Sequence, residues 1–156
     1  MAAQPAADPT LREALQHYFA QYHFADGGYT ERWFRIKLGP LFIPLPNIPA
    51  RVRAVKVHDI HHVLTGYRAD WKGEVEIGAW ELASGCGRYW VAWLLNAGSF
   101  TIGLVLYRRA LWRAFREGRR VRVNLYHGVP YNDALLASRV SGLRARYGIA
   151  PVGDGA

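Results

Sequence analysis

The sequence predicts an all-α protein: a single compact helical domain in which a Pro-rich extended arm precedes a hairpin of two helices. Apolar residues recur every three or four positions over most of the chain. Capping residues and glycines stand where these stretches begin and end. The chain has 156 residues, enough for one ordinary core and too few for two. We therefore expect one domain over 1–156, with its core in 8–150 and frayed termini.

The first helix is expected to run from Pro9 to about His23. Asp8 can cap it, because proline at the first helical position gives up an amide that would be unpaired anyway. The run Asp26-Gly27-Gly28 supplies a stop. Residues 29–49 then form the extended arm, because proline denies a helix its hydrogen bonds. The arm can pack across the core or cover a pocket, and a short strand pair is the alternative; its four prolines are Pro40, Pro44, Pro46 and Pro49.

Two helices follow the arm as a hairpin. Valines and leucines recur at helical intervals over 50–64, and Thr65-Gly66 ends that helix. Asp70 is placed to cap the next helix, over about 71–83. The break at 84–87 contains two glycines and Cys86, the only cysteine, so no intrachain disulfide can form and a reducing compartment fits best.

The stretch 89–107 carries no formal charge over nineteen residues. That length could just span a bilayer, but Asn96, Ser99 and Thr101 near its middle favour a buried or lipid-lining helix. A final helix is expected between the caps Asn132-Asp133 and a stop at Gly148.

Arginines are concentrated after this uncharged stretch. The chain has 20 basic and 12 acidic residues, a formal charge of +8. The arginine-rich continuation is expected to form an amphipathic helix, with Leu111, Trp112 and Phe115 on one side and arginines on the other. Such a helix can lie on an anionic membrane surface, and an ordinary solvated helix face is the alternative. Nucleic acid is not the expected partner, because no recognised reading motif accompanies the arginines. The predicted membrane contacts are Arg108, Arg109, Arg113 and Arg116.

Four strong metal-ligand side chains lie close together in the hairpin: His58, Asp59, His62 and Glu74. On a helix the two histidines lie one turn apart and Asp59 three residues before His62, so these three can converge, while Glu74 enters from the next helix. Two imidazoles with carboxylates suit zinc, iron or manganese better than calcium or magnesium. We expect zinc, with iron as the alternative.

Neighbouring residues have lesser expected roles. His61 lies about 100° from His62 around the helix and should point elsewhere, into packing or behind the ligands. Glu81 could hydrogen-bond a ligand imidazole and fix its tautomer. The alternative without a metal has His58 capping carbonyls and the acids Asp59 and Glu74 paired with arginines such as Arg68.

The motif residues resemble a known family. His58-Asp59-x-x-His62, followed after eleven residues by Glu74, is similar to the H-D-x-x-H-x11-E signature of the coenzyme Q (ubiquinone) biosynthesis family numbered four in its series. The similarity extends over about 51–149, with weaker support from Leu64-Thr65-Gly66-Tyr67, Gly73 and Leu143–Ile149. The chain is shorter than typical members and its Pro-rich arm is distinctive, which suggests a divergent bacterial-type member.

The resemblance implies an all-helical metal protein with an apolar pocket for a polyprenyl or other long-chain lipid. It implies that His58, Asp59, His62 and Glu74 hold the metal, usually zinc, and that the protein removes the C1 carboxyl of a polyprenyl benzoate oxidatively. Glu74 could instead act as a base. The alternative is a non-catalytic lipid-binding scaffold with a structural metal. Other quinone-biosynthesis enzymes are implied partners, and a homodimer is left open.

The N-terminal residues bear on location. The start at Met1–Pro5 has neither a basic leader nor an apolar core, so nothing resembles a cleaved secretory signal. We therefore expect a cytoplasmic protein that is peripheral at the inner face of the membrane.

Overall fold

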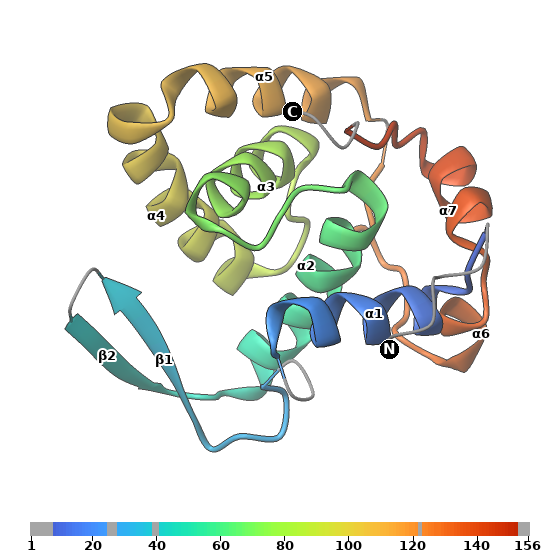
Figure 1. Ribbon diagram of the computed structural model, residues 1–156, viewed down its shortest axis with the longest axis horizontal. Helices are drawn as coiled ribbons and strands as arrows, with labels where there is room; N and C mark the ends of the chain where they lie inside the picture. The colour runs from blue at the N-terminus through green and yellow to red at the C-terminus, as the bar shows by residue number, and fades with distance from the viewer. Residues whose placement is uncertain (1–7, 25–27, 39–40, 122, 153–156) are drawn as a thin grey trace.

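The computed structural model describes residues 8–24, 28–38, 41–121 and 123–152, and it is mostly helical, as predicted (Figure 1). Figure 1 shows a body of helices from which one β-hairpin extends. The helices are α1 (Leu11–Tyr22), α2 (Pro49–Thr65), α3 (Trp71–Ser84), α4 (Trp90–Leu106), α5 (Arg108–Arg120), α6 (Asp133–Leu136) and α7 (Val140–Tyr147).

Helix α3 lies at the centre of the body. Figure 1 shows α4 and α5 bending around it, with α2 on another side. Its residues from Val75 to Glu81 are all buried, including Trp80. A helix that is buried on all sides needs apolar or fully hydrogen-bonded residues all round. The buried acidic residues of α3, Glu76 and Glu81, therefore need hydrogen-bond or ion-pair partners inside the protein.

The connection between α2 and α3 is formed by the residues that were predicted to end one helix and cap the next. Gly66 adopts a left-handed conformation (φ 80°) after the last residue of α2, and its N–H donates to the carbonyl of His62. The Asp70 side chain then accepts a hydrogen bond from the N–H of Gly73 and caps α3. These two local signals turn α3 back toward α2.

The start of α1 differs from the prediction. Thr10, rather than Asp8, caps the helix, because its hydroxyl and the Glu13 carboxylate satisfy each other's backbone amides. Asp8 accepts hydrogen bonds from the N–H and hydroxyl of Ser141 instead. The helix ends at Tyr22, before a left-handed His23 (φ 56°). The predicted stop at Asp26-Gly27 lies outside the described residues.

The predicted last helix is split into α6 and α7. Asn132 caps α6 and Gly148 ends α7, as expected. Between them the chain leaves the helical path to pair with the residues before α1: Ser138 accepts from the N–H of Leu11, and Val140 donates to the carbonyl of Pro9. This pairing with a distant segment interrupts the helix.

The Pro-rich arm is a β-hairpin of β1 (Trp33–Leu38) and β2 (Leu41–Pro46). The strands are antiparallel, with a register from Trp33↔Pro46 to Leu38↔Leu41. The strand-pair alternative is therefore the one observed. Figure 1 shows the hairpin extending away from the helices instead of across the core.

Helix α4 presents two different faces. Its seventeen residues carry buried Val91, Ala92 and Asn96 on one side, while Leu94 and Val105 on the other are 64% and 80% exposed. None of the described helices is both long and apolar enough to cross a membrane.

Close packing of α5 on α3 depends on Gly118. A Cβ there would lie 2.3 Å from the backbone oxygen of Trp80 and 2.9 Å from Ala83 Cβ. We expect Gly118→Ala to lower the free energy of unfolding by about 1–3 kcal/mol, because backbone cannot yield as a side chain can. Urea denaturation measures this. The control is Gly98→Ala in α4, where nothing lies within 4 Å; it should be neutral or stabilising, and an equal loss in both variants would contradict the packing explanation.

Candidate metal centre

Three of the predicted ligands converge between α2 and α3. The His58 and His62 Nε2 atoms lie 3.1 Å apart. The Glu74 carboxylate, from the first turn of α3, places Oε2 3.4 Å from His58 Nε2 and Oε1 3.3 Å from His62 Nε2. One ligand atom from each residue fits within 4.8 Å of the others. Ligand atoms around tetrahedral zinc, each about 2.0–2.2 Å from the ion, lie about 3.3 Å from one another, so the spacing suits such an ion.

Outer hydrogen bonds fix both imidazoles. His62 Nδ1 lies 2.9 Å from the carbonyl of Tyr67, and His58 Nδ1 lies 3.1 Å from Glu81 Oε1. Both partners only accept, so each Nδ1 donates and each Nε2 of a neutral ring directs a lone pair at the other. Two facing lone pairs and the Glu74 carboxylate repel one another unless a proton or a cation lies between them. These three residues could hold a divalent metal ion.

Glu81 organises the inner side of the centre. Its fully buried carboxylate accepts hydrogen bonds through Oε1 from His58 Nδ1 (3.1 Å) and His61 Nδ1 (2.7 Å). Oε2 accepts from Asn96 Nδ2 (2.6 Å) and the Tyr126 hydroxyl (3.2 Å). Burial alone raises the pKa of Glu81, but the charge of His58 and the hydrogen bonds from both histidines hold this pKa well below its usual range. The ionised carboxylate thus orients His58, as the sequence predicted.

His61 points away from the three ligands, also as predicted. Its ring is fully buried, makes edge contacts with Trp80 and Tyr126, and accepts a hydrogen bond from the N–H of Leu125 at Nε2 (3.2 Å). Burial lowers the pKa of His61, so the ring is neutral. Its Nδ1–H donates a hydrogen bond to Glu81 Oε1. His61 therefore holds the 124–126 segment against α2 and α3.

Asp59 lies beside the centre, but its carboxylate faces a different partner. The Tyr29 hydroxyl donates to Asp59 Oδ2 at 2.5 Å. Burial raises the pKa of Asp59 to about 6, against the lowering effect of nearby His58. The structure thus brings His58, His62 and Glu74 together. It directs Asp59 toward Tyr29, in the segment that precedes the β-hairpin. That Asp59 also binds the metal stays a prediction.

Several contacts of the centre were not predicted. The Tyr18 ring stacks on His62 with centroids 5.5 Å apart, and the Tyr67 carbonyl, Asn96 and Tyr126 complete the outer contacts. Tyr67 belongs to the stretch that follows the motif histidines, but no spacing relates Tyr18, Asn96 and Tyr126 to the motif. The one sequence signal is Asn96, a polar side chain in an otherwise uncharged helix.

The alternative without a metal loses one of its expected contacts. Arg68 bonds Asp70 at 2.9 Å rather than Asp59 or Glu74. Glu74 faces the two histidines. Comparison with family models, curated proteins and solved structures found no match to this chain. The family resemblance therefore stays a prediction carried by the motif residues.

Proposed function

We propose that this chain is a metal-binding protein of ubiquinone or related prenyl-quinone biosynthesis, with His58, His62 and Glu74 holding zinc, or iron as the alternative. The observation that supports the metal is the pair of facing Nε2 atoms closed by a carboxylate. The lipid context is supported by the motif resemblance. When bound, a divalent metal would polarise an oxygen of the substrate as a Lewis acid.

The chain's own residues suit this role. Glu81 and the Tyr67 carbonyl orient the two imidazoles, while the Glu74 side chain is 43% exposed and leaves the centre open on its side. An open position is what separates a catalytic zinc site from a closed structural one. As the alternative, Glu74 could leave the metal and take a proton from a substrate. The reaction that the resemblance implies is the oxidative removal of the ring C1 carboxyl from a polyprenyl benzoate.

Metal binding should release a proton near pH 7. Burial lowers the pKa of His58, but neighbouring Glu81 and Glu74 overcome this and hold that pKa well above its usual value in the metal-free protein. His58 is then protonated at neutral pH, and a metal must displace that proton. Zinc affinity should rise with pH until the folded-state pKa of His58 is passed. Titration calorimetry in two buffers of different ionisation enthalpy should show release of about one proton, whereas no release would contradict this expectation.

The quinone pathway is tested by lipid analysis. A source strain without this protein should lose quinone and accumulate a prenylated aromatic precursor, and wild-type protein should restore the quinone. The double variant H58A/H62A should fail to restore it although the chain is produced. Normal quinone and precursor levels in the strain without the protein would remove the biosynthetic proposal.

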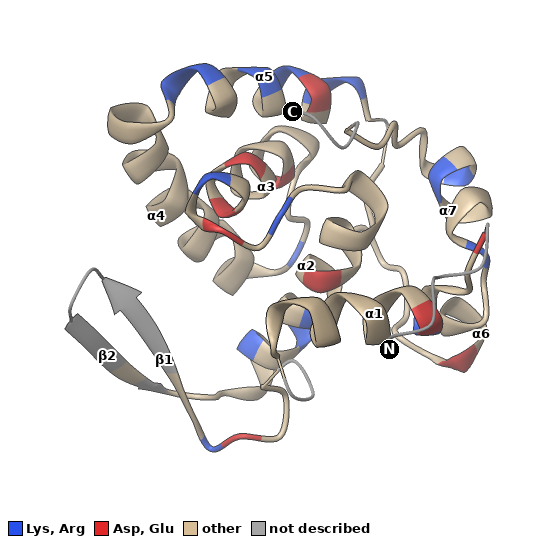
Figure 2. Cartoon of the chain, viewed as in Figure 1, with Lys and Arg blue, Asp and Glu red and all other residues tan. Residues whose placement is uncertain are grey.

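A lipid-binding membrane-surface scaffold is the second candidate, supported by the outer face of α4. Figure 2 shows no charged residue along α4 and several blue ones along α5. Leu94, Val105 and Leu106 are 64%, 80% and 66% exposed, and exposed Arg108 and Arg109 follow after Tyr107. Apolar residues beside arginines suit an anionic interface.

Of the remaining predicted membrane contacts, Arg116 is exposed. Arg113 forms an ion pair with buried Glu76 (2.6 Å), so its positive charge is partly neutralised within the protein. The surface proposal therefore depends mainly on Arg108, Arg109 and Arg116.

Vesicle binding tests the α4 face. We expect flotation of the wild type with vesicles that contain phosphatidylglycerol, and Val105→Glu should weaken this binding about tenfold or more, because it puts a charge into the apolar contact. Val123→Glu is the matched control: it makes the same charge change at an exposed valine after α5. Equal loss in both variants would show that overall charge alone, not the α4 face, controls binding.

A further inference from the structure

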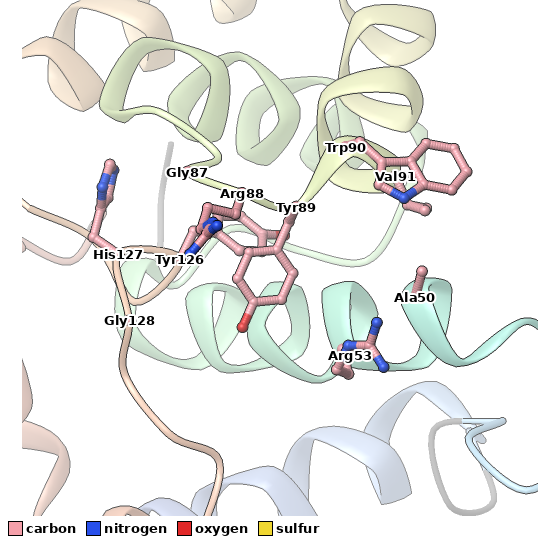
Figure 3. A pocket seen from close by; sticks show the side chains of 10 residues that line it. All are labelled: Ala50, Arg53, Gly87, Arg88, Tyr89, Trp90, Val91, Tyr126, His127 and Gly128. Carbon is pink, nitrogen blue, oxygen red and sulfur yellow. The ribbon is translucent and has the colours of Figure 1, made fainter.

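A cavity lies away from the metal ligands. It has a volume of about 570 Å³ and opens between the first half of α2, the α3–α4 connection and the 126–128 turn (Figure 3). None of the three metal ligands lines it. The residues that define its chemistry are Arg53, Arg88, Tyr89, Trp90, Tyr126 and His127.

The cavity is positively charged. Arg53 rises from α2 and Arg88 from the α3–α4 connection, and no acidic residue is among the lining residues. Within the described part of the chain neither guanidinium has a carboxylate partner, whereas Arg12, Arg68 and Arg113 each have one. Two guanidinium groups without a carboxylate partner favour a carboxylate or phosphate in the cavity, because one guanidinium can bind such a group with two parallel hydrogen bonds.

The walls between these arginines are aromatic. The Tyr89 and Tyr126 rings contact each other with centroids 4.9 Å apart, and Figure 3 shows Tyr89 lying over α2 near Arg53. Trp90 is 58% exposed at the same opening. Flat rings offer stacking surface to a flat ligand.

The innermost wall is rigid. The Tyr126 hydroxyl is held by Glu81 Oε2 (3.2 Å) and by the Ala54 carbonyl (3.3 Å), and the whole residue is buried. A wall fixed in this way loses little conformational entropy when a ligand binds. The cavity is thus preformed on the side that faces the core.

We propose that this cavity binds a small aromatic anion, with the carboxylate or phosphate on the guanidinium of Arg53 or Arg88 and the ring against Tyr89 and Trp90. The site is separate from the metal centre and needs no metal for its own contacts. Zinc binding is measured on the same samples, so a failure of the anion-binding proposal can be told apart from a failure of the proposed metal-binding function.

The test follows the Trp90 indole N–H by ¹⁵N NMR during titration with benzoate, phenyl phosphate and neutral benzamide. We expect at least one of the two anions to shift this resonance saturably, and benzamide to bind at least about tenfold more weakly. The double variant R53Q/R88Q should weaken anion binding at least about tenfold, with its folding checked by thermal unfolding.

The control is Arg119→Gln, which replaces an exposed arginine on α5 that does not line the cavity. It should leave the anion affinity unchanged. Three results would overturn the proposal: no saturable shift with either anion, benzamide binding as tightly as benzoate, or equal weakening by R119Q and by R53Q/R88Q.

Discussion

Replacing His62 or Glu74 by alanine is expected to weaken zinc binding to the apoprotein by more than about a hundredfold. Loss of a direct ligand should exceed the ten- to hundredfold effect that outer contacts usually have. His62 is fully buried, so no solvent molecule easily takes its place, and Glu74 supplies the only carboxylate within reach of both Nε2 atoms among the described residues. Competition with a fluorescent zinc indicator measures the affinity.

The control for these variants is His17→Ala, which removes an exposed histidine of α1. Its zinc affinity should equal that of the wild type. If His62→Ala and Glu74→Ala behave like His17→Ala, the convergence of the three side chains is not a metal site.

The same titration decides the role of Asp59. Asp59→Asn keeps the size of the side chain and an oxygen that can accept from the Tyr29 hydroxyl. A loss of zinc affinity as large as that of Glu74→Ala would make Asp59 the fourth ligand. Affinity close to that of His17→Ala would leave three protein ligands and an open fourth position.

Glu81→Ala is expected to lower the free energy of unfolding by about 3–5 kcal/mol, because it leaves buried donors without their charged acceptor. The groups that lose their acceptor are His58 Nδ1, His61 Nδ1, Asn96 Nδ2 and the Tyr126 hydroxyl. Urea unfolding with a chelator present measures the loss separately from any contribution of a bound metal.

Two further variants delimit the role of Glu81. Glu81→Gln keeps the shape but presents an amide donor to groups that also donate, so we expect an intermediate loss of stability and a zinc affinity lowered about 10–100-fold. Glu117→Ala removes a partly exposed acid that pairs with Arg120, and it should cost less than about 1 kcal/mol. A Glu81→Ala effect as small as that of Glu117→Ala would contradict the proposed network.

The sequence predicted those features that depend on nearby residues. Thr65-Gly66 and Asp70 act within a few positions of the helices that they end or begin, so the hairpin could be inferred. Helical spacing alone placed His58 and His62 on one face, and the early position of Glu74 in α3 placed it opposite them.

Other features depend on residues far along the chain and leave no local signal. Asp8 bonds Ser141, 133 positions away, and so does not cap α1. Backbone pairing of Pro9 and Leu11 with Val140 and Ser138 interrupts the last helix. Asp59 follows His58 directly, but its carboxylate accepts a hydrogen bond from the hydroxyl of Tyr29, thirty residues earlier. The partners of Glu81 come from three separate segments, so the buried network could not be read from spacing.

The most direct test of the central claim is the metal content of protein purified without added metal, measured by inductively coupled plasma mass spectrometry. The site predicts about one zinc or iron ion per wild-type chain and none in H58A/H62A. A wild-type chain that carries no stoichiometric metal, and takes up none when dialysed against zinc, would contradict the metal centre.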